Sequence, residues 1–340
     1  MILDSSIATK FQEFAEQCHG SSALYERLSL KIADDEQILD LCTHAKPGQP
    51  IPNLLFATVQ YLLFKGQKHP LRNFYASIVD SPEDDIAQSF THFKDFCLKH
   101  DKEIKTILQN KNVQTNEVRR CAYLYPCFCY MYEKAKKPLA LIEIGTSAGL
   151  QLLWDQYSYS YGTSQIYGNP QAEVHIDSKT RGDIPFLLSS SPPVVKRFGV
   201  DLHINRLSID EDKLWLKALI WPEHEERRKI FEAASQVVNK SHLELIEGDG
   251  VDLLPEIVKK IPNDTIIGVF HTHVANQFSN ESKEKLLHLI SKIGEERDIF
   301  HLYNNIQDRY LHLDYVLNGE NSHQIIGETE GHGRWFSLDI

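Results

Sequence analysis

The chain has 340 residues, of which 42% are hydrophobic and 24% are charged. This composition is typical of a folded globular protein, and the length suits two domains. The formal net charge of -11 repels polyphosphate, so we expect no nucleic acid partner. The sequence has no basic start followed by an apolar stretch, and no apolar run of about 18 residues. We therefore expect a cytoplasmic protein that does not cross a membrane.

Residues 1–137 predict one helix after another. Apolar residues in the segment 53–66 fall on one stripe at helical spacing, and Gly66 stands where this helix is expected to end. The segment 115–137 opens with a Thr and an Asn that suit a helix cap and ends in lysines, and Pro126 is expected to kink it. The sequence thus predicts an all-helical N-terminal domain.

From Pro138 onward, short apolar runs alternate with helical patterns. The continuously apolar run at 139–145 suits a strand that is buried on both faces of a parallel sheet. Alternating strands and helices form βαβ units, so most of this sheet is expected to be parallel. Further strands are expected at 197–204, 242–248, 265–270 and 298–304, and helices at 149–157, 209–238, 251–261 and 281–294.

Other segments of this second domain, expected over residues 138–340, carry different signals. Two tail segments flank a turn-like NGENS, which predicts an antiparallel C-terminal strand. Aromatic and polar residues alternate after Tyr157, which indicates a hairpin-like insertion at about 157–195. Pro222 is expected in the first turn of a helix whose apolar stripe packs on the sheet. That stripe comprises Ile230, Phe231, Ala234, Val237 and Val238.

The segment LIEIGTSAGL, residues 141–150, predicts a ligand-binding turn after the first strand. The strand ends in Glu143, and Gly145 and Gly149 permit positive φ and a close approach to the backbone. Ser147 stands where a dinucleotide-binding turn has its second glycine, which weakens that interpretation. The spacing is similar to that of Rossmann-like methyltransferases, where the acid and the loop hold the methionine part of S-adenosylmethionine. A turn that needs glycine for its geometry alone is the alternative.

Acidic residues at the ends of later strands extend this hypothesis. Asp201 is placed to accept hydrogen bonds from two ribose hydroxyls, or it is an exposed turn acid, and Asp177 is the reserve candidate. The interval from the glycine turn to Asp201 exceeds the usual distance of about 20 residues, which the insertion explains. Asp249 suits an adenine amino group, with Gly250 leaving room for the ring, or else Asp249 caps the following helix.

His271 and His273 follow the fourth expected strand, at the edge where a substrate would meet the cofactor. Either imidazole suits a general base or a substrate contact. Packing is an alternative for both residues. A zinc site with both histidines as ligands is a further alternative, although no third ligand is evident at a spacing typical of zinc sites.

The runs QTNEVRRCAYLYP, PLALIEIGTSAGLQLLWDQYSYSYG, RFGVDLHIN, WLKALIWPEHEERR, EGDGVDLLP and VFHTHV closely resemble the uncharacterised bacterial family known as domain of unknown function 2332. The similarity is strongest over residues 110–275. This family is grouped with Rossmann-like methyltransferases. The resemblance therefore implies a Rossmann-like methyltransferase sheet, mostly parallel with an antiparallel C-terminal strand, behind a helical N-terminal domain.

The resemblance also suggests further site residues. It supports the loop assignment of Glu143, Gly145, Ser147 and Gly149, whereas Gln151 departs from the family's common Asn. Polar residues before the first strand are implied to cover the cofactor pocket, or they cap a helix. Aromatic residues after Asp155 are implied to line a substrate mouth, or they form a packing face. The first group is Gln114, Thr115, Asn116 and Glu117, and the second includes Tyr157, Tyr159 and Tyr161.

The leading hypothesis is a methyltransferase that uses S-adenosylmethionine on a small molecule, with the helical domain as lid or substrate platform. A non-catalytic binding or regulatory module on the same fold is the second hypothesis. A metal-assisted hydrolase that uses His271 and His273 is the third. The sequence does not name the methyl acceptor or the oligomeric state.

Overall fold

The computed structural model describes residues 5–83, 85–183 and 186–340, which form two compact units. The first unit comprises the described residues up to Thr115 together with Ile209–Lys229. The second comprises the described residues of Asn116–Ser208 and Ile230–Ile340. This division differs from the expected boundary at 137/138, because the last helix before the sheet belongs to the second unit and a segment from mid-chain belongs to the first. The insertion expected at 157–195 includes residues 184–185, which lie outside the described residues.

The first unit is helical. The helix α4 (Ile51–Phe64) is buried on nearly every side, which explains why the sequence of this helix is apolar almost throughout. Around it, Tyr25 stacks on Phe56 with ring centroids 4.2 Å apart. Ser22 and Asp35 cap two helices by accepting from the backbone N–H groups three residues ahead. The elements are α1 (Ser5–Cys18), α2 (Ala23–Ile32), α3 (Glu36–Cys42), α4 (Ile51–Phe64), η1 (Pro70–Phe74), η2 (Ile86–Gln88), α5 (Ser89–Lys99), α6 (Asp101–Asn110) and α8 (Asp210–Ala218).

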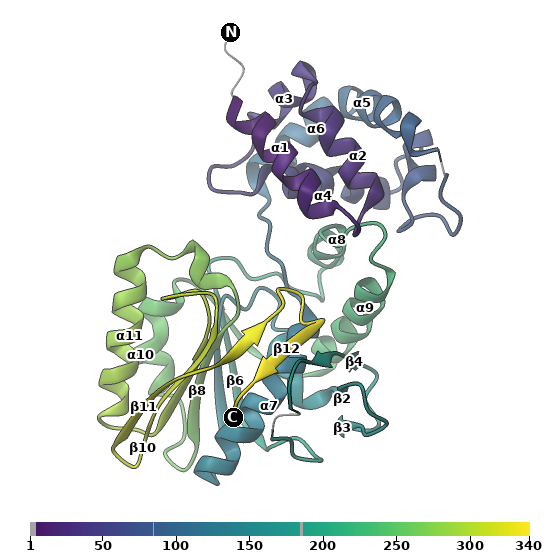
Figure 1. The fold of residues 1–340 in the computed structure, drawn as a ribbon. Coiled ribbons are helices and arrows are strands. Elements are labelled where there is room, and N and C mark those ends of the chain that lie inside the picture. Colours follow the sequence, from purple (N-terminus) through teal and green to yellow (C-terminus); the bar gives the residue numbers. More distant parts are fainter. Residues whose placement is uncertain (1–4, 84, 184–185) are drawn as a thin grey trace. The chain divides into compact units, whose positions relative to one another are not determined.

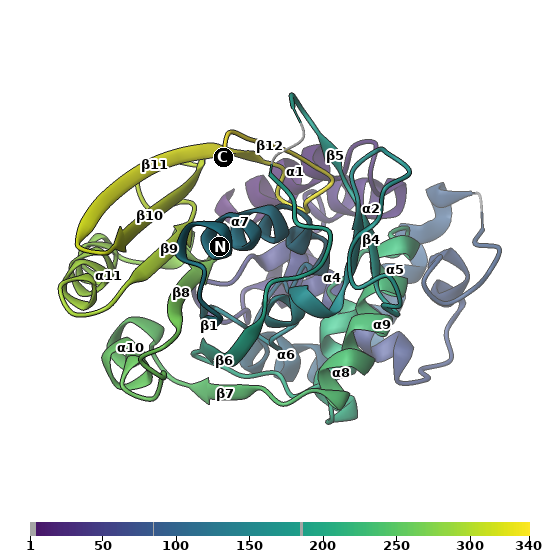
Figure 2. The ribbon, with the colours of Figure 1, turned by 90° about the horizontal axis from the view of Figure 1, so that it is seen from below.

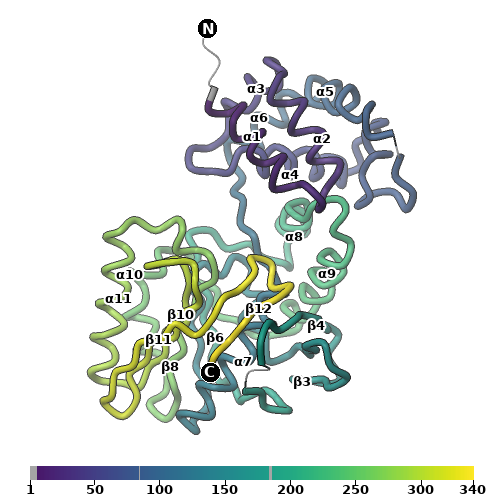
Figure 3. The backbone as a smooth tube through the Cα atoms, viewed as in Figure 1, coloured from purple at the N-terminus to yellow at the C-terminus, as the bar shows by residue number. Residues whose placement is uncertain are grey.

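The second unit is built on a nine-stranded sheet of order β5-β12-β11-β10-β9-β8-β1-β6-β7 (Figure 1). Strands β7, β6, β1, β8 and β9 are parallel. Strands β10, β11 and β12, yellow in Figure 3, follow one another along the chain, and β9 to β12 pair antiparallel. The strands are β1 (Leu139–Ile144), β5 (Lys179–Thr180), β6 (Val194–Asp201), β7 (Glu244–Glu247), β8 (Ile266–His271), β9 (Ile299–Tyr303), β10 (Leu311–Leu317), β11 (Glu320–Thr329) and β12 (Trp335–Leu338).

Helices cover both faces of the parallel strands (Figure 2). On one face, Ala140, Ile142 and Ile144 of β1 pack in a core with α10 (Gly250–Val258) and α11 (Asn280–Gly294). On the other face lies α7 (Cys121–Ala135), whose Phe128 meets Phe270 of β8 edge to face at 5.3 Å. Because side chains alternate along a strand, Glu143 lies on the α7 face. Both faces of β1 are thus buried, as its apolar run predicts.

The expected parallel strands, the helices at 251–261 and 281–294 and the antiparallel C-terminal pairing are present. Within the insertion, β2 (Ser158–Ser160) pairs antiparallel with β3 (Tyr167–Gly168) and parallel with β4 (His175–Asp177). In the described part of the chain, no helix is long and apolar enough to cross a membrane.

Two details of the predicted helices are wrong. The helix expected at 149–157 is a 3-10 helix, η4 (Gln151–Gln156), with Leu153 outside the helical region. The segment 209–238 forms two helices, and Pro222 precedes α9 (Glu225–Lys240) instead of occupying its first turn. The residues of the predicted stripe are inward-facing, because Ile230, Phe231, Ala234 and Val238 are buried and Val237 is partly buried, whereas their expected packing on the sheet stays a prediction. Two further short elements of this unit are η3 (Val118–Arg120) and η5 (Val274–Gln277).

Candidate functional site

The candidate site lies at the carboxyl edge of the parallel strands. In chain order these strands lie 3-2-1-4-5, an arrangement shared with doubly wound sheets, whose ligands bind beyond the carboxyl ends of the strands at the point where the order reverses. Here that point lies between β1 and β8. Glu143, Asp201 and His271 belong to the ends of β1, β6 and β8, and Asp249 follows β7. The structure therefore brings four predicted site residues to one edge of the sheet.

The loop after β1 is fixed to the end of β6. Gly145, Ser147 and Gly149 all have positive φ, at +79°, +52° and +78°. The N–H of Gly145 donates to the carbonyl oxygen of Val200 at 2.8 Å. The N–H of Ser147 donates to Asp201 Oδ2 at 2.8 Å, and Asp201 Oδ1 accepts from the N–H of His203 at 3.2 Å. Asp201 thus contacts the glycine turn directly, across 54 positions of sequence.

The glycines of the site are required by the packing of the protein itself. A Cβ atom at Gly145 would lie 2.6 Å from Cγ2 of Val274. A Cβ atom at Gly149 would lie 2.8 Å from Leu243, and one at Gly250 would lie 2.7 Å from Ile144. These contacts explain the three glycines without a ligand. The glycines therefore do not distinguish a cofactor loop from a turn that needs glycine for geometry alone.

Glu143 is a buried acid, 3% exposed, below this loop. Its Oε2 accepts a hydrogen bond from the hydroxyl of Thr146 at 2.6 Å. Burial raises the pKa of Glu143 to about 8, and the Thr146 bond offsets only part of that effect. The side chain is therefore mainly protonated at neutral pH, and a cationic group placed beside it would favour loss of that proton.

Asp249 and Asp177 occupy different kinds of position. Asp249 is the N-cap of α10, where its Oδ1 accepts from the N–H groups of Val251 and Asp252 at 2.8 and 3.2 Å. The predicted capping role is confirmed, and the exposed carboxylate keeps free lone pairs. Asp177, the reserve ribose acid, lies on β4 of the small three-stranded sheet. Of the two ribose candidates, only Asp201 stands at the parallel edge.

His271 is deeply buried at the end of β8. It is 1% exposed, and its Nε2 lies 3.3 Å from Nε2 of His301. Burial lowers the pKa of His271 to about 3, so its imidazole is neutral at physiological pH. Its Nδ1 has no hydrogen-bond partner among the described residues. Such a ring is a neutral acceptor or donor of hydrogen bonds, and packing explains much of its position.

His273 has a left-handed backbone, with φ +60°, and its N–H donates to Asn304 Oδ1 at 2.8 Å. Burial, with the nearby charge of Arg120, lowers its pKa to about 3. Nε2 of this ring is buried and has no partner within the described ranges. No group of three or more His, Cys, Asp or Glu side chains in those ranges is placed to hold a metal ion. The metal interpretation of the two histidines therefore gains no support.

The polar residues before β1 are divided between the two units. Gln114 and Thr115 end a segment of the first unit. In the second unit, Asn116 Nδ2 donates to the carbonyl oxygen of Thr146 at 2.7 Å, so Asn116 helps to hold the glycine turn. Glu117, rather than Thr115, provides the cap, because its carboxylate accepts from the N–H of Arg119 at the start of η3.

Tyr157 and Tyr159 are fully buried. The hydroxyl of Tyr157 donates to the carbonyl oxygen of Leu150 at 2.8 Å, and that of Tyr159 donates to the carbonyl oxygen of Trp154. The Tyr159 ring lies parallel to that of Tyr161, with centroids 6.3 Å apart. These positions favour the packing interpretation of the tyrosines.

Sequence reasoning missed two features of this edge. Leu202, directly after Asp201, is 75% exposed. The sequence shows only that a leucine follows the candidate acid, and not that its side chain is exposed. Arg120 donates to the hydroxyl of Thr272 at 3.2 Å and to the carbonyl oxygen of Gly331 at 2.9 Å. That link joins residues 211 positions apart, so no local pattern predicts it.

The fold and the edge together define an α/β protein with a doubly wound parallel core and an acid-rich carboxyl edge. Residues 8–338 match the model of the family described as "Uncharacterized protein conserved in bacteria (DUF2332)". The chain belongs to this family, and the predicted family resemblance is confirmed. No curated protein and no solved structure matches the chain.

Proposed function

We propose that the second unit binds S-adenosylmethionine at the carboxyl edge of β1, β6 and β7, and transfers its methyl group to a small molecule. The observation that carries the proposal is the contact between Asp201 and the turn after β1, with Ser147 N and Asp201 Oδ2 2.8 Å apart. An acid at the end of the second strand, beside a glycine turn after the first, is where a bound nucleoside meets its ribose partner in doubly wound sheets.

Asp201 retains the capacity to bind ribose. Asp201 is partly exposed, and each of its oxygens accepts a backbone N–H. We place the two hydroxyl groups of a ribose at the exposed side of this carboxylate. The backbone bonds fix the orientation of the carboxylate before a ligand arrives, which reduces the entropy lost on binding.

Leu202 supports the nucleoside assignment independently of the glycines. An apolar side chain that is 75% exposed gains free energy when a flat ring covers it. Asp249, which follows the neighbouring strand β7, keeps lone pairs for an adenine amino group beyond its capping bonds. An apolar surface beside a ribose acceptor, with a further acceptor on the next strand, fits adenosine.

Glu143 suits the amino acid part of the ligand. Its pKa of about 8 reflects burial, which the Thr146 hydrogen bond and the nearby charge of Arg120 offset only in part. An ammonium group beside Glu143 would favour the carboxylate, and the pair would then be charged and hydrogen-bonded. Ligand binding is therefore expected to release a proton from Glu143 at neutral pH.

Bound S-adenosylmethionine supplies an electrophilic methyl group, so the protein has mainly to orient the acceptor and, for a protonated nucleophile, to accept a proton. His273 offers a neutral imidazole whose buried Nε2 has no partner in the described part of the chain, and with a pKa of about 3 it suits a hydrogen bond to the acceptor better than removal of a proton. His271 is more deeply buried and bonded to His301, so we assign it to positioning. The burial of both rings is also the observation that favours the second candidate function, a non-catalytic module that binds the same ligand.

Calorimetric titration of the whole chain with S-adenosylmethionine, S-adenosylhomocysteine and NAD tests the proposal. The first two are expected to bind with submillimolar affinity and NAD more weakly. Leu202→Asp is expected to weaken their binding by about tenfold, since it places a charge against the adenine surface. Ile166→Asp is the matched control, because Ile166 is 53% exposed and lies in the insertion. Gly145→Val is unsuitable, because its Cβ would meet Val274 and unfold the loop with or without a ligand.

Absence of binding by both sulfur compounds, or equal binding by the wild type and Leu202→Asp, would refute the nucleoside site. If both compounds bind but a panel of small acceptors yields no S-adenosylhomocysteine, the non-catalytic module becomes the better description.

A further inference from the structure

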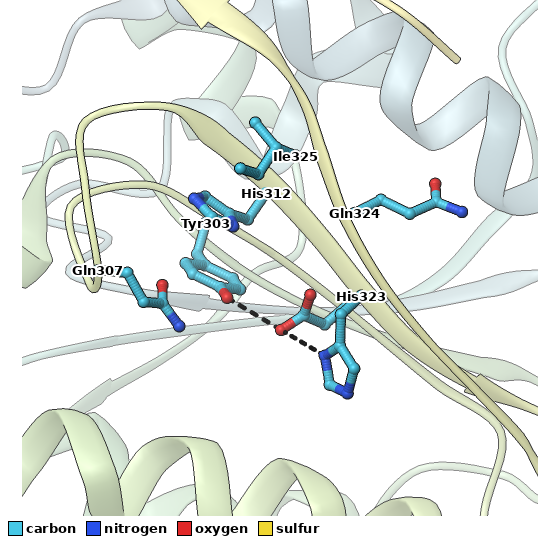
Figure 4. Close-up of a pocket in the computed structure, with 7 residues that line it drawn as sticks. Tyr303, Gln307, His312, His323, Gln324 and Ile325 are labelled. Atoms are coloured by element: carbon cyan, nitrogen blue, oxygen red, sulfur yellow. Dashed lines mark hydrogen bonds and ion pairs between the residues drawn. The ribbon is translucent and has the colours of Figure 1, made fainter.

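A pocket lies on the antiparallel side of the sheet (Figure 4), on strands separated in the strand order from those that carry or lead to Glu143, Asp201 and Asp249. It has a volume of about 310 Å³ and is formed by β9, β10, β11 and the loop between β9 and β10. Its lining residues are Tyr303, Gln307, His312, Asp314, His323, Gln324 and Ile325. No Lys or Arg is among them, so the pocket has one carboxylate and no permanent cation in its lining.

Asp314 is the charged group of this pocket, although it is only 8% exposed. Strand register places it opposite His323 on β11 and His301 on β9. Its Oδ2 accepts from the hydroxyl of Tyr303 at 2.9 Å and lies 3.2 Å from Nδ1 of His323, with which it forms an ion pair when the imidazole is protonated (Figure 4). Among the described residues, Asp314 Oδ1 accepts no hydrogen bond. One oxygen of a nearly buried carboxylate therefore remains available.

The walls of the pocket suit a short organic group. The Tyr303 and His312 rings are stacked, with centroids 5.0 Å apart. Burial raises the pKa of Tyr303, so its hydroxyl remains a donor to Asp314. Gln307 and Gln324 add amide oxygens that accept from N–H groups, and Ile325, 61% exposed, provides an apolar wall.

From these contacts we propose that the pocket binds a small organic cation, an ammonium or guanidinium group on a short apolar chain. A nearly buried carboxylate is stabilised by a cation that donates to its free oxygen. Amide oxygens of the lining accept the remaining N–H bonds of such a group. An anion would be repelled by Asp314, and a neutral alcohol would leave the charge uncompensated. This proposal does not depend on the nucleoside site.

The test uses the whole chain and four probes of similar size at constant ionic strength: n-butylammonium, n-butylguanidinium, n-butanol and butyrate. Ligand-detected NMR titration is expected to show saturable binding of the two cations only. Asp314→Asn preserves an acceptor for Tyr303 and is expected to weaken cation binding by roughly tenfold or more. Glu320→Gln is the matched control, because Glu320 is an exposed acid on the same hairpin that lies outside the pocket lining.

A second pair of variants keeps the test valid if Asp314→Asn does not fold. Ile325→Lys places a positive charge on the exposed wall and is expected to abolish cation binding, whereas Ile325→Met is expected to retain it. The proposal is overturned if butanol or butyrate binds as well as butylammonium, or if Ile325→Lys binds the cations like the wild type. Because Leu202→Asp leaves this pocket intact, failure of cation binding and failure of the nucleoside site are separate results.

Discussion

At the scale of single residues, Glu143 makes the stability of the protein depend on pH. Its pKa in the folded chain is about 8, above its ordinary value of 4.5. The folded state therefore holds a proton that the unfolded state releases between these two values, so this contribution is full below about pH 4.5 and is lost as the pH rises through about 8. Relative to Glu143→Gln, the wild type is expected to lose on the order of 1 kcal/mol per pH unit across this window.

Urea unfolding of the wild type and Glu143→Gln at several pH values from about 5 to 9 measures this difference. Gln retains the shape of the protonated acid and an acceptor for the Thr146 hydroxyl. Two stability curves that run parallel over the whole range would show that Glu143 is ionised in the folded protein.

Single residues also show where sequence reasoning stops. Asp201 was predictable, because a continuous strand pattern leads to it and an edge position follows from strand order. The partners of Asp314 were not, because Tyr303 and His323 reach it through cross-strand register. Register is set by the assembled sheet, and local composition does not specify it. The same limit applies to Arg120, whose partner Gly331 is distant in sequence.

At the scale of elements, Asp249 is expected to stabilise α10. Its carboxylate accepts from two N–H groups that otherwise have no partner within the helix. Asp249→Ala is expected to lower the free energy of unfolding by about 1 kcal/mol, and Asp249→Ser to retain most of it, since serine is also a good N-cap. Thermal or urea unfolding measures both changes. Equal losses for Ala and Ser would contradict the capping role. Titration of Asp249→Ser with S-adenosylmethionine then separates adenine binding from stability. Serine restores the helix cap but lacks the carboxylate, so weaker binding by this variant would indicate that Asp249 contacts the ligand.

The elements of the sheet were predictable because their apolar runs are continuous and bounded by polar turns. The element after the glycine turn was not. Gln151, Leu152, Leu153 and Trp154 are all buried, so this segment has no polar face from which a helical period can be read. Leu153 leaves the helical region there, and the chain continues into β2 after a short 3-10 helix. The pattern indicated burial correctly and the helix type incorrectly.

At the scale of the whole molecule, the first unit is discontinuous in sequence. Its residues up to Thr115 are completed by Ile209–Lys229, a segment that lies between β6 and β7 along the chain. Trp215 of this segment is 1% exposed, and its indole N–H donates to the carbonyl oxygen of Asn112 at 2.9 Å. Gln60, fully buried on α4, donates to the carbonyl oxygens of Ala218 and Ile220 at 2.8 and 2.7 Å. The mid-chain segment is therefore part of the core of the first unit, which no boundary drawn along the sequence predicts.

It follows that residues 1–115 alone are not expected to fold stably. Without the mid-chain segment, the Gln60 amide loses both acceptors, and the surface that covers Trp215 becomes exposed. A single-chain version that joins Thr115 to residues 209–229 through a flexible linker restores these contacts. We expect a cooperative urea transition and dispersed amide NMR signals from the linked version and neither from residues 1–115. In the full chain, Trp215→Ala is expected to cost about 3 kcal/mol or more for the first unit. If the fragment 1–115 is as stable as the linked version, residues 209–229 are not needed to complete the core of the first unit.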